Sequence, residues 1–338
     1  MSRTRSWTWR RVGKWVAGIL IIGWSLAPIY YALVVSLMTP AGLQSVPPSL
    51  VPHPFTFSYY TQLLDGSSSV SQDFLTALKN TLIESVCTTV LTVLVALLAA
   101  YPFARMPFRG SRLLFYVVLG TFALPVYAVL IPLFQFTSHV HQDDTYQAIV
   151  FIYASASLPL AIWLLRSHIA ALPVDLENAA RIDGAGTFRL LRRIVLPLIA
   201  PAIAAVGVIV FLTAWAAYLI PLTFAPTLAS SPLTVLIPQY ASRFSQDYGL
   251  QAAAGLIALL PPALVVLWLN RHLMRGLLTG ALKQLNDADV QAVGLEPGEL
   301  GRVGVLVGDQ RVDRGQRADG SESHPAELGA VGKHHHSF

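Results

Sequence analysis

The stretch LPVDLENAARIDGAGTFRLLRRIVLP, residues 172–197, is a charged, helix-forming segment between two long apolar runs. Asp175 can accept a hydrogen bond from an amide of an opening helical turn, and Glu177 favours the positive end of the helix dipole. Arg181 follows Glu177 at the i,i+4 spacing that stabilises a helix. Asp183-Gly184 is typical of a turn, because glycine tolerates backbone angles that other residues avoid. The stretch therefore predicts two short helices joined by a turn.

The composition of the whole chain is that of a membrane protein. Of its 338 residues, 54% are hydrophobic and only 12% are charged, and the mean hydropathy is +0.57. Soluble domains carry about 25% charged residues. The single cysteine, Cys87, excludes a disulfide within the chain. The net charge of +5 fits basic loops beside a membrane better than nucleic-acid binding.

Six apolar runs follow one another along the chain, and each is long enough to cross a hydrocarbon layer about 30 Å thick as a helix. Helices satisfy their own backbone hydrogen bonds in lipid, so the runs predict an all-α polytopic membrane protein with six transmembrane helices. The charged stretch then lies between the fourth and fifth spans. The six runs cover about residues 15–37, 75–103, 113–136, 146–165, 198–221 and 250–269.

The basic residues predict the orientation of these spans. Lys and Arg gather before the first span, in 104–112, in 166–197 and after the sixth span, whereas the other connections carry almost none. Positive residues stay on the cytoplasmic side, so both termini and the charged stretch are expected there. We expect a basic cytoplasmic N-terminus at 1–14, a membrane domain at 15–284, and a cytoplasmic tail at 285–338 whose polar, Gly-rich composition predicts disorder.

The charged stretch also resembles a known motif. Asn178-Ala179-Ala180, Gly184, Ile194 and Leu196-Pro197 are similar to the EAA loop of permease subunits of bacterial ABC importers. In that family the loop forms coupling helices that dock into the ATPase subunit. One departure is that Asn178 stands where the family usually has Glu, with Glu177 one residue earlier. The resemblance implies that ATPase coupling involves Glu177, Asn178, Ala179, Ala180, Arg181, Asp183, Gly184, Ala185, Ile194, Leu196 and Pro197.

Further stretches resemble the carbohydrate-type, maltose-permease-like branch of this family. They lie at 74–81, 99–110, 124–134 and 276–283, so the resemblance covers roughly residues 10–284. It implies a permease subunit in the bacterial cytoplasmic membrane, within an ATP-driven importer of a sugar or sugar derivative. The implied partners are the lipid bilayer, a second homologous permease, two ATPase subunits and an extracytoplasmic, lipoprotein-type substrate-binding protein, with no nucleic acid.

The sequence predicts no enzymatic activity for this chain. No Gly-x-x-x-x-Gly-Lys-Ser/Thr segment is present, so ATP and Mg²⁺ are expected on the partner ATPase, with no cofactor on this chain. His139, His141, Asp143 and Asp144 are metal-ligand types on one short connector, but solvated loop polarity explains them better.

Polar residues within the spans are candidates for the solute pathway. Asn80, Glu84 and Thr88 share one helical face, which fits either a pore-lining stripe or a polar contact with a helix of a neighbouring subunit. The remaining candidates combine aromatic rings and hydroxyls that suit a sugar, although membrane aromatics also serve packing and interfacial anchoring. These candidates are Tyr153, Ser155, Trp215 and Tyr218.

Two other functional classes remain open from the residues alone. An ion-coupled secondary transporter of a small polar solute usually carries several membrane-embedded acids or broken-helix ion sites, whereas this chain has Glu84. A membrane-embedded hydrolase needs a nucleophile and base, or a metal site, at membrane depth. ATP dependence of uptake separates the importer from the first alternative.

Overall fold

Helix α4, Ser69–Arg105, is the longest described helix, with 37 residues that span about 55 Å. The structure is a computed structural model that describes residues 5–46, 49–106, 108–242 and 245–269. The Ser68 hydroxyl caps the start of α4 by accepting a hydrogen bond from the Ser71 amide at 3.2 Å. Arg105 stands in the last turn, where a positive side chain favours the negative end of the helix dipole.

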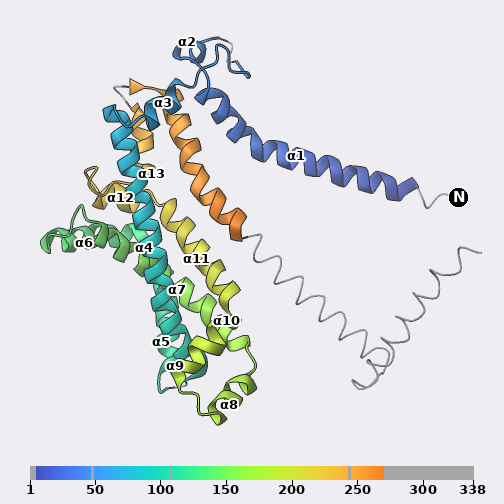
Figure 1. Ribbon diagram of the computed structural model, residues 1–338, viewed down its shortest axis with the longest axis vertical. Helices are drawn as coiled ribbons and strands as arrows, with labels where there is room; N and C mark the ends of the chain where they lie inside the picture. The colour runs from blue at the N-terminus through green and yellow to red at the C-terminus, as the bar shows by residue number, and fades with distance from the viewer. Residues whose placement is uncertain (1–4, 47–48, 107, 243–244, 270–338) are drawn as a thin grey trace, which may run out of the picture. The chain divides into compact units, whose positions relative to one another are not determined.

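Helix α7, Tyr146–Ala171, packs along α4, and α11, Ala200–Trp215, packs against both (Figure 1). Half of the most apolar window of α7 is buried inside the protein, against 6% for α1, Arg5–Ser36. Helices α4 and α7 therefore form the centre of the described domain, and α1 lies at its periphery. The main apolar cluster gathers around the end of α4 that carries Arg105, including residues of α7, α8 and α11.

Four described helices are long and apolar enough to cross a membrane: α1, α4, α7 and the helix Tyr248–Leu269. A fifth crossing is formed if two helices that meet at a sharp bend count as one span. These are Thr187–Leu198 and α11, which meet at 76°. Pro201 explains the break, because it has no amide to donate to the Pro197 carbonyl one turn earlier.

The predicted third span, 113–136, is wrong as a single helix. The chain forms α5, Ser111–Thr121, and α6, Val126–His139, with a break between them. Pro125 stands at the N-cap of α6 and disfavours helical backbone at the preceding residue. Figure 1 shows α6 turned away from the direction of α4. Hydropathy is continuous here although the helix is not.

The predicted fifth span, 198–221, is also divided. Helix α11 ends at Trp215, and the chain continues through three short helical segments and a small hairpin. Strands β1 and β2 pair antiparallel, with Ala241 opposite Gln246. These elements are α12 (Leu219–Phe224), α13 (Leu233–Leu236), η2 (Ile237–Tyr240), β1 (Ala241–Ser242) and β2 (Ser245–Gln246).

The connection between α1 and α4 contains two short helices, α2 (Pro40–Leu43) and α3 (Ser58–Leu64). Tyr59 and Leu63 of α3 are buried in a cluster with Phe74 of α4. This cluster also includes residues of α13 and of the helix Tyr248–Leu269, so the end of α4 that carries Ser69 has its own core. The predicted tail, 285–338, and the end of the predicted membrane domain lie outside the described residues.

Candidate functional site

The charged stretch forms two short helices, as predicted: α8, Val174–Ile182, and α9, Thr187–Leu190. Between them Gly184 adopts a left-handed conformation with φ of +77°. Its amide donates to the Arg181 carbonyl at 3.0 Å, and the next amide donates to the Ala180 carbonyl at 2.9 Å. These two hydrogen bonds form a Schellman motif, which ends a helix at a glycine and fixes the direction of the following chain.

The start of α8 differs in detail from the prediction. Pro173 occupies the N-cap, and no side chain caps the helix. Asp175 lies in the first turn, so it contributes a negative charge near the helix start but makes no capping bond. The predicted i,i+4 pair is confirmed, with Arg181 Nη2 at 3.6 Å from Glu177 Oε2.

Glu177 anchors α8 to the end of α4. Its side chain is 2% exposed, and Arg105 Nε donates to its Oε1 at 2.6 Å. The Tyr101 hydroxyl donates to Oε2 at 3.3 Å. Arg105 Nη2 also donates to the Leu172 carbonyl at 2.6 Å, just before α8 begins. One arginine therefore ties both the helix and its entry to α4.

After α9 the chain passes through a π-helix, Leu191–Val195, and a short turn, α10 (Leu196–Leu198), before the bend into α11. Leu190 and Val195 are buried in the main apolar cluster. The stretch is therefore attached to the membrane domain at two places, through Glu177 on one side and through these buried residues on the other.

The two faces of the α8–α9 segment differ. Ala180 packs into the main apolar cluster. The segment also carries exposed apolar side chains: Leu176, Ile182 and Phe188 are 47%, 86% and 75% exposed. The predicted coupling residues divide accordingly: Glu177 and Ala180 are buried, Ala185, Ile194 and Leu196 are partly buried, and Asn178, Ala179, Arg181, Asp183, Gly184 and Pro197 are exposed.

Sequence reasoning missed Tyr101 and Arg105, which hold Glu177. Both lie on one face at the end of α4, at i and i+4, but their partner is more than seventy residues further along the chain. The need for such partners follows from the burial of Glu177, because a buried carboxylate requires a partner, and this burial is seen only in the structure. The sequence does not say which of the loop arginines supplies that partner.

Asn80 lies at the other end of α4, about 38 Å from Arg105 along the helix. Its amide donates to the carbonyls of Leu228 and Ser231 at 2.9 and 3.0 Å. Its Oδ1 accepts from the Tyr146 hydroxyl at 2.6 Å. Asn80 is fully buried, so it joins α4, α7 and the segment before α13 within this chain.

Glu84 and Thr88 continue the face that begins at Asn80, as predicted, and both are buried. Tyr153 of α7 is 3% exposed. Among the described residues, Glu84 Oε1, Thr88 Oγ1 and the Tyr153 hydroxyl have no hydrogen-bond partner. The interior around α4 and α7 is therefore polar over several turns, with atoms that can still accept or donate.

The remaining pathway candidates do not converge on one cavity. Trp215 is buried and donates from Nε1 to the Ala258 carbonyl at 3.2 Å. Tyr218 is 43% exposed. Ser155 lines a pocket of about 530 Å³ at the break between α5 and α6, and Tyr153 is not among the residues that line it. The structure thus separates the side chains that the sequence grouped.

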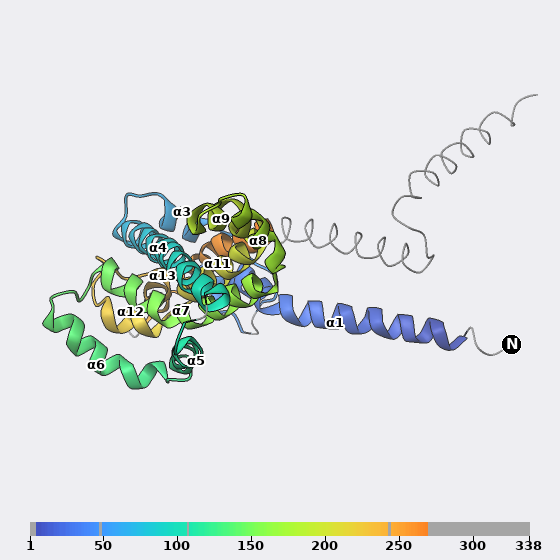
Figure 2. The ribbon, with the colours of Figure 1, turned by 90° about the horizontal axis from the view of Figure 1, so that it is seen from below.

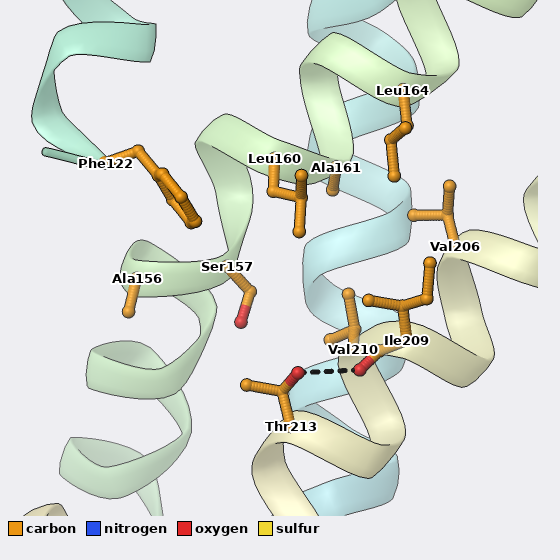
Figure 3. Close-up of a pocket in the computed structure, with 10 residues that line it drawn as sticks. All are labelled: Phe122, Ala156, Ser157, Leu160, Ala161, Leu164, Val206, Ile209, Val210 and Thr213. Carbon is orange, nitrogen blue, oxygen red and sulfur yellow. Dashed lines mark hydrogen bonds between the residues drawn. The ribbon is translucent and has the colours of Figure 1, made fainter.

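A second pocket, of about 280 Å³, lies between α7 and α11. Its walls are mostly aliphatic, as Figure 3 shows, with Ser157 and Thr213 as its hydroxyl groups. The Thr213 hydroxyl already donates to the Ile209 carbonyl at 2.8 Å. Such a surface suits apolar packing better than the binding of a polar solute.

The connector carries histidines and aspartates, but in the described part of the chain no three such side chains are placed close enough together to hold a metal ion. Asp144 instead accepts hydrogen bonds from the hydroxyls of Thr227 and Ser230. It ties the connector before α7 to the same segment that Asn80 holds.

The described chain thus combines apolar helices long enough to cross a membrane with a charged loop of two short helices that a buried ion pair fixes to α4. The chain belongs to the family described as the binding-protein-dependent transport system inner membrane component, which matches residues 92–279. The sequence-based recognition of a permease subunit is thereby confirmed.

Three relatives show the same extent of similarity. The trehalose transport system permease protein SugB of Mycobacterium tuberculosis is 31% identical over 81% of this chain and 98% of its own length. The trehalose/maltose transport system permease protein MalG of Thermococcus litoralis is 32% identical over 81% of this chain and 97% of its own length. The sulfoquinovosyl glycerol transport system permease protein SmoH of Agrobacterium fabrum is 29% identical over 80% of this chain and 93% of its own length.

The fold is similar to that of solved transporters. A chain of a bacterial ABC transporter involved in the import of the acidic polysaccharide alginate matches with a TM-score of 0.68 and 20% identity, over 80% of this chain and 98% of that chain. The alginate ABC transporter in complex with alginate pentasaccharide-bound periplasmic protein matches with a TM-score of 0.58 and 19% identity, over 80% of this chain and 96% of that chain. At this identity the likeness concerns the fold.

Proposed function

We propose that this chain is one of two transmembrane subunits of an ATP-driven importer for a sugar or sugar derivative. Its family supports the importer, and the names of relatives that transport trehalose, maltose and sulfoquinovosyl glycerol support the solute class. The chain itself has no ATP-binding loop, so a separate ATPase binds ATP and Mg²⁺.

The observation that carries the proposal is the two-sided α8–α9 segment. A buried ion pair fixes its inner side to α4, while Leu176, Ile182 and Phe188 remain exposed apolar side chains on the same segment. Exposed apolar groups of this size favour a protein partner. The ATPase subunit occupies this face.

Movement of α8 reaches the membrane domain by two routes. The Arg105–Glu177 pair connects α8 to α4, and the π-helix connects α9 to α11. When ATP closes the two ATPase subunits, both routes carry the displacement inward and shift the balance between inward-open and outward-open states. Release of hydrolysis products reverses the displacement.

The assembly contains a second, homologous permease and receives solute from an extracytoplasmic, lipoprotein-type binding protein. It lies in the bacterial cytoplasmic membrane, with six spans and both termini in the cytoplasm, as the placement of Lys and Arg indicates. The chain divides into a basic N-terminus at 1–14, a permease domain at 15–284 and a tail at 285–338. Within the permease domain, the polar interior around Asn80, Glu84 and Tyr153 borders the solute pathway.

The test is transport by the complete assembly in proteoliposomes, with solute-loaded binding protein outside and ATP inside. Uptake should require ATP and the binding protein, and a protonophore should leave it unchanged. Uptake that collapses with the protonophore but persists without ATP would establish the ion-coupled alternative.

A further inference from the structure

A polar pocket lies between α5 and α7, at the end of the domain where α4 gives way to α5. Its volume is about 380 Å³. In Figure 2, the ribbon of α5 lies toward the lower edge of the described helices and α8 and α9 lie toward the upper edge. None of the residues that line the pocket belongs to α8 or α9. The pocket is lined by Phe103, Ser111, Arg112, Phe115, Tyr116 and Arg166.

Arg166 is held in a fixed position on the wall of this pocket. Its Nε donates to the Phe103 carbonyl at 3.2 Å, and its guanidinium carbon lies 4.4 Å from the centre of the Phe115 ring. Within the described chain, only Nε of its donors has a protein acceptor. The two terminal nitrogens of a rigid, planar group are therefore left to bind an anion in the pocket.

Arg112 adds a second positive charge from the first turn of α5. Both ion pairs of the described residues end on Glu177, so neither Arg112 nor Arg166 has a carboxylate partner there. Ser111 brings a hydroxyl, and the first turn of α5 adds the partial positive charge of a helix start. Two unpaired arginines that share one pocket favour an anion with several acceptor oxygens, such as a phosphate.

An apolar surface continues directly from the pocket. On α5, Leu113, Tyr116 and Val117 are 71%, 63% and 56% exposed. A ligand that fills the pocket with its anionic group can thus lay hydrocarbon along the same helix. This combination of chemistries belongs to a phospholipid rather than to a soluble phosphate.

We propose that the pocket binds the phosphate of an anionic phospholipid, between Arg112 and Arg166, with its acyl chains along α5. Basic pockets between membrane helices on the cytoplasmic side are suited to anionic headgroups. The bound lipid would brace α5 against α7 beside Phe103, two residues before the arginine that anchors α8. It is a site distinct from the ATPase face.

The test measures lipid binding to the purified assembly in detergent by native mass spectrometry, with phosphatidylglycerol and zwitterionic phosphatidylcholine as probes. The wild type should bind phosphatidylglycerol more tightly. Arg112→Gln should weaken that binding about fivefold, and the Arg112→Gln/Arg166→Gln double variant about 25-fold, at roughly 1 kcal/mol for each charge removed. Arg109→Gln is the matched control, because this exposed arginine lies outside the pocket lining.

Arg166 also supports the fold, so Arg166→Lys serves as a second variant that keeps the charge but not the planar fork. It should bind phosphatidylglycerol more weakly than wild type while its elution profile in size-exclusion chromatography is unchanged. Equal affinity for the two lipids, or an equal loss in Arg109→Gln, would overturn the proposal. Displacement of the lipid by glycerol phosphate at a similar concentration would also overturn it, because that result indicates a site for soluble phosphate. Loss of the ATPase subunit from the Arg112→Gln assembly would overturn it as well, because that result indicates a protein contact.

Discussion

Arg105 and Glu177, on helices far apart in the sequence, meet at 2.6 Å with side chains only 9% and 2% exposed. With the bonds that Tyr101 and Arg105 donate to Glu177 and the Leu172 carbonyl, the pair connects α4, the longest described helix, directly to the segment proposed to dock the ATPase. A buried pair of this kind contributes little net stability, but removing one partner is costly because the other charge is left unpaired.

Glu177→Gln should therefore uncouple transport. The change keeps the shape of the side chain but leaves the Arg105 guanidinium without its counter-charge, at a cost of about 3–5 kcal/mol. We expect sugar uptake in proteoliposomes to fall by about tenfold or more. Arg181→Gln is the control, because Arg181 contacts the same carboxylate from an exposed position at 3.6 Å, where an ion pair contributes about 0–1 kcal/mol. Equal losses in both variants would contradict the anchoring role.

Gly184 should be sensitive to substitution because of its backbone and not because of crowding. A Cβ at this position meets no atom within 4 Å, yet φ is +77°. Gly184→Ala should destabilise the turn by about 1–2 kcal/mol and lower uptake. Gly186→Ala, which also enters open space but has an ordinary φ of −68°, should be tolerated. If both variants transport alike, the turn conformation does not matter for coupling.

Cysteine crosslinking distinguishes the two faces of α8. In a Cys87→Ser background, Ile182→Cys and Ala179→Cys should crosslink to the ATPase subunit, because both positions are exposed. Ala180→Cys should not, since Ala180 is packed in the apolar cluster. Crosslinks from position 180 alone would reverse the assignment of inner and outer faces.

Asn80→Ala should destabilise the end of the domain opposite α8. The change leaves two buried carbonyls and the Tyr146 hydroxyl without their partner, and each lost bond costs about 1–3 kcal/mol. The melting temperature of the purified assembly should drop, whereas Thr76→Ala, at an exposed position of the same helix, should leave it unchanged. An unaltered melting temperature for Asn80→Ala would show that these bonds are replaceable.

Deletion of 286–338 should leave transport intact. The family match ends at residue 279, and the relatives are covered over nearly their whole length by 80–81% of this chain. The measurement is uptake and co-purification of the partner subunits by the truncated chain. Failure of the subunits to assemble would assign the tail a structural role.

Local patterns predicted the local features well. Asp183-Gly184 predicted the turn, and the i,i+4 spacing predicted the Glu177–Arg181 contact. Both features depend on residues that are only a few positions apart. The shared face of Asn80, Glu84 and Thr88 is also real, since all three are buried.

Features that depend on distant residues were not predictable in the same way. Asn80 pairs with backbone groups 148 and 151 residues away, and no spacing rule identifies such partners. Trp215 was proposed from its suitability for a sugar ring. In the structure its indole N–H donates to a carbonyl of this chain, a bond that sequence spacing does not predict. The prediction of a single helix for the third span was wrong for another reason. Hydropathy depends only on composition, whereas the break before α6 depends on the backbone angles that Pro125 disfavours at the preceding residue.

The bend at Ile199 determines the direction in which a displacement of the docking segment moves α11. Because Thr187–Leu198 meets α11 at 76°, a force directed along the first helix acts almost entirely across the axis of the second. In the proposed mechanism, a displacement of the docking segment by the ATPase subunits would therefore move the start of α11 sideways and hardly along its own axis.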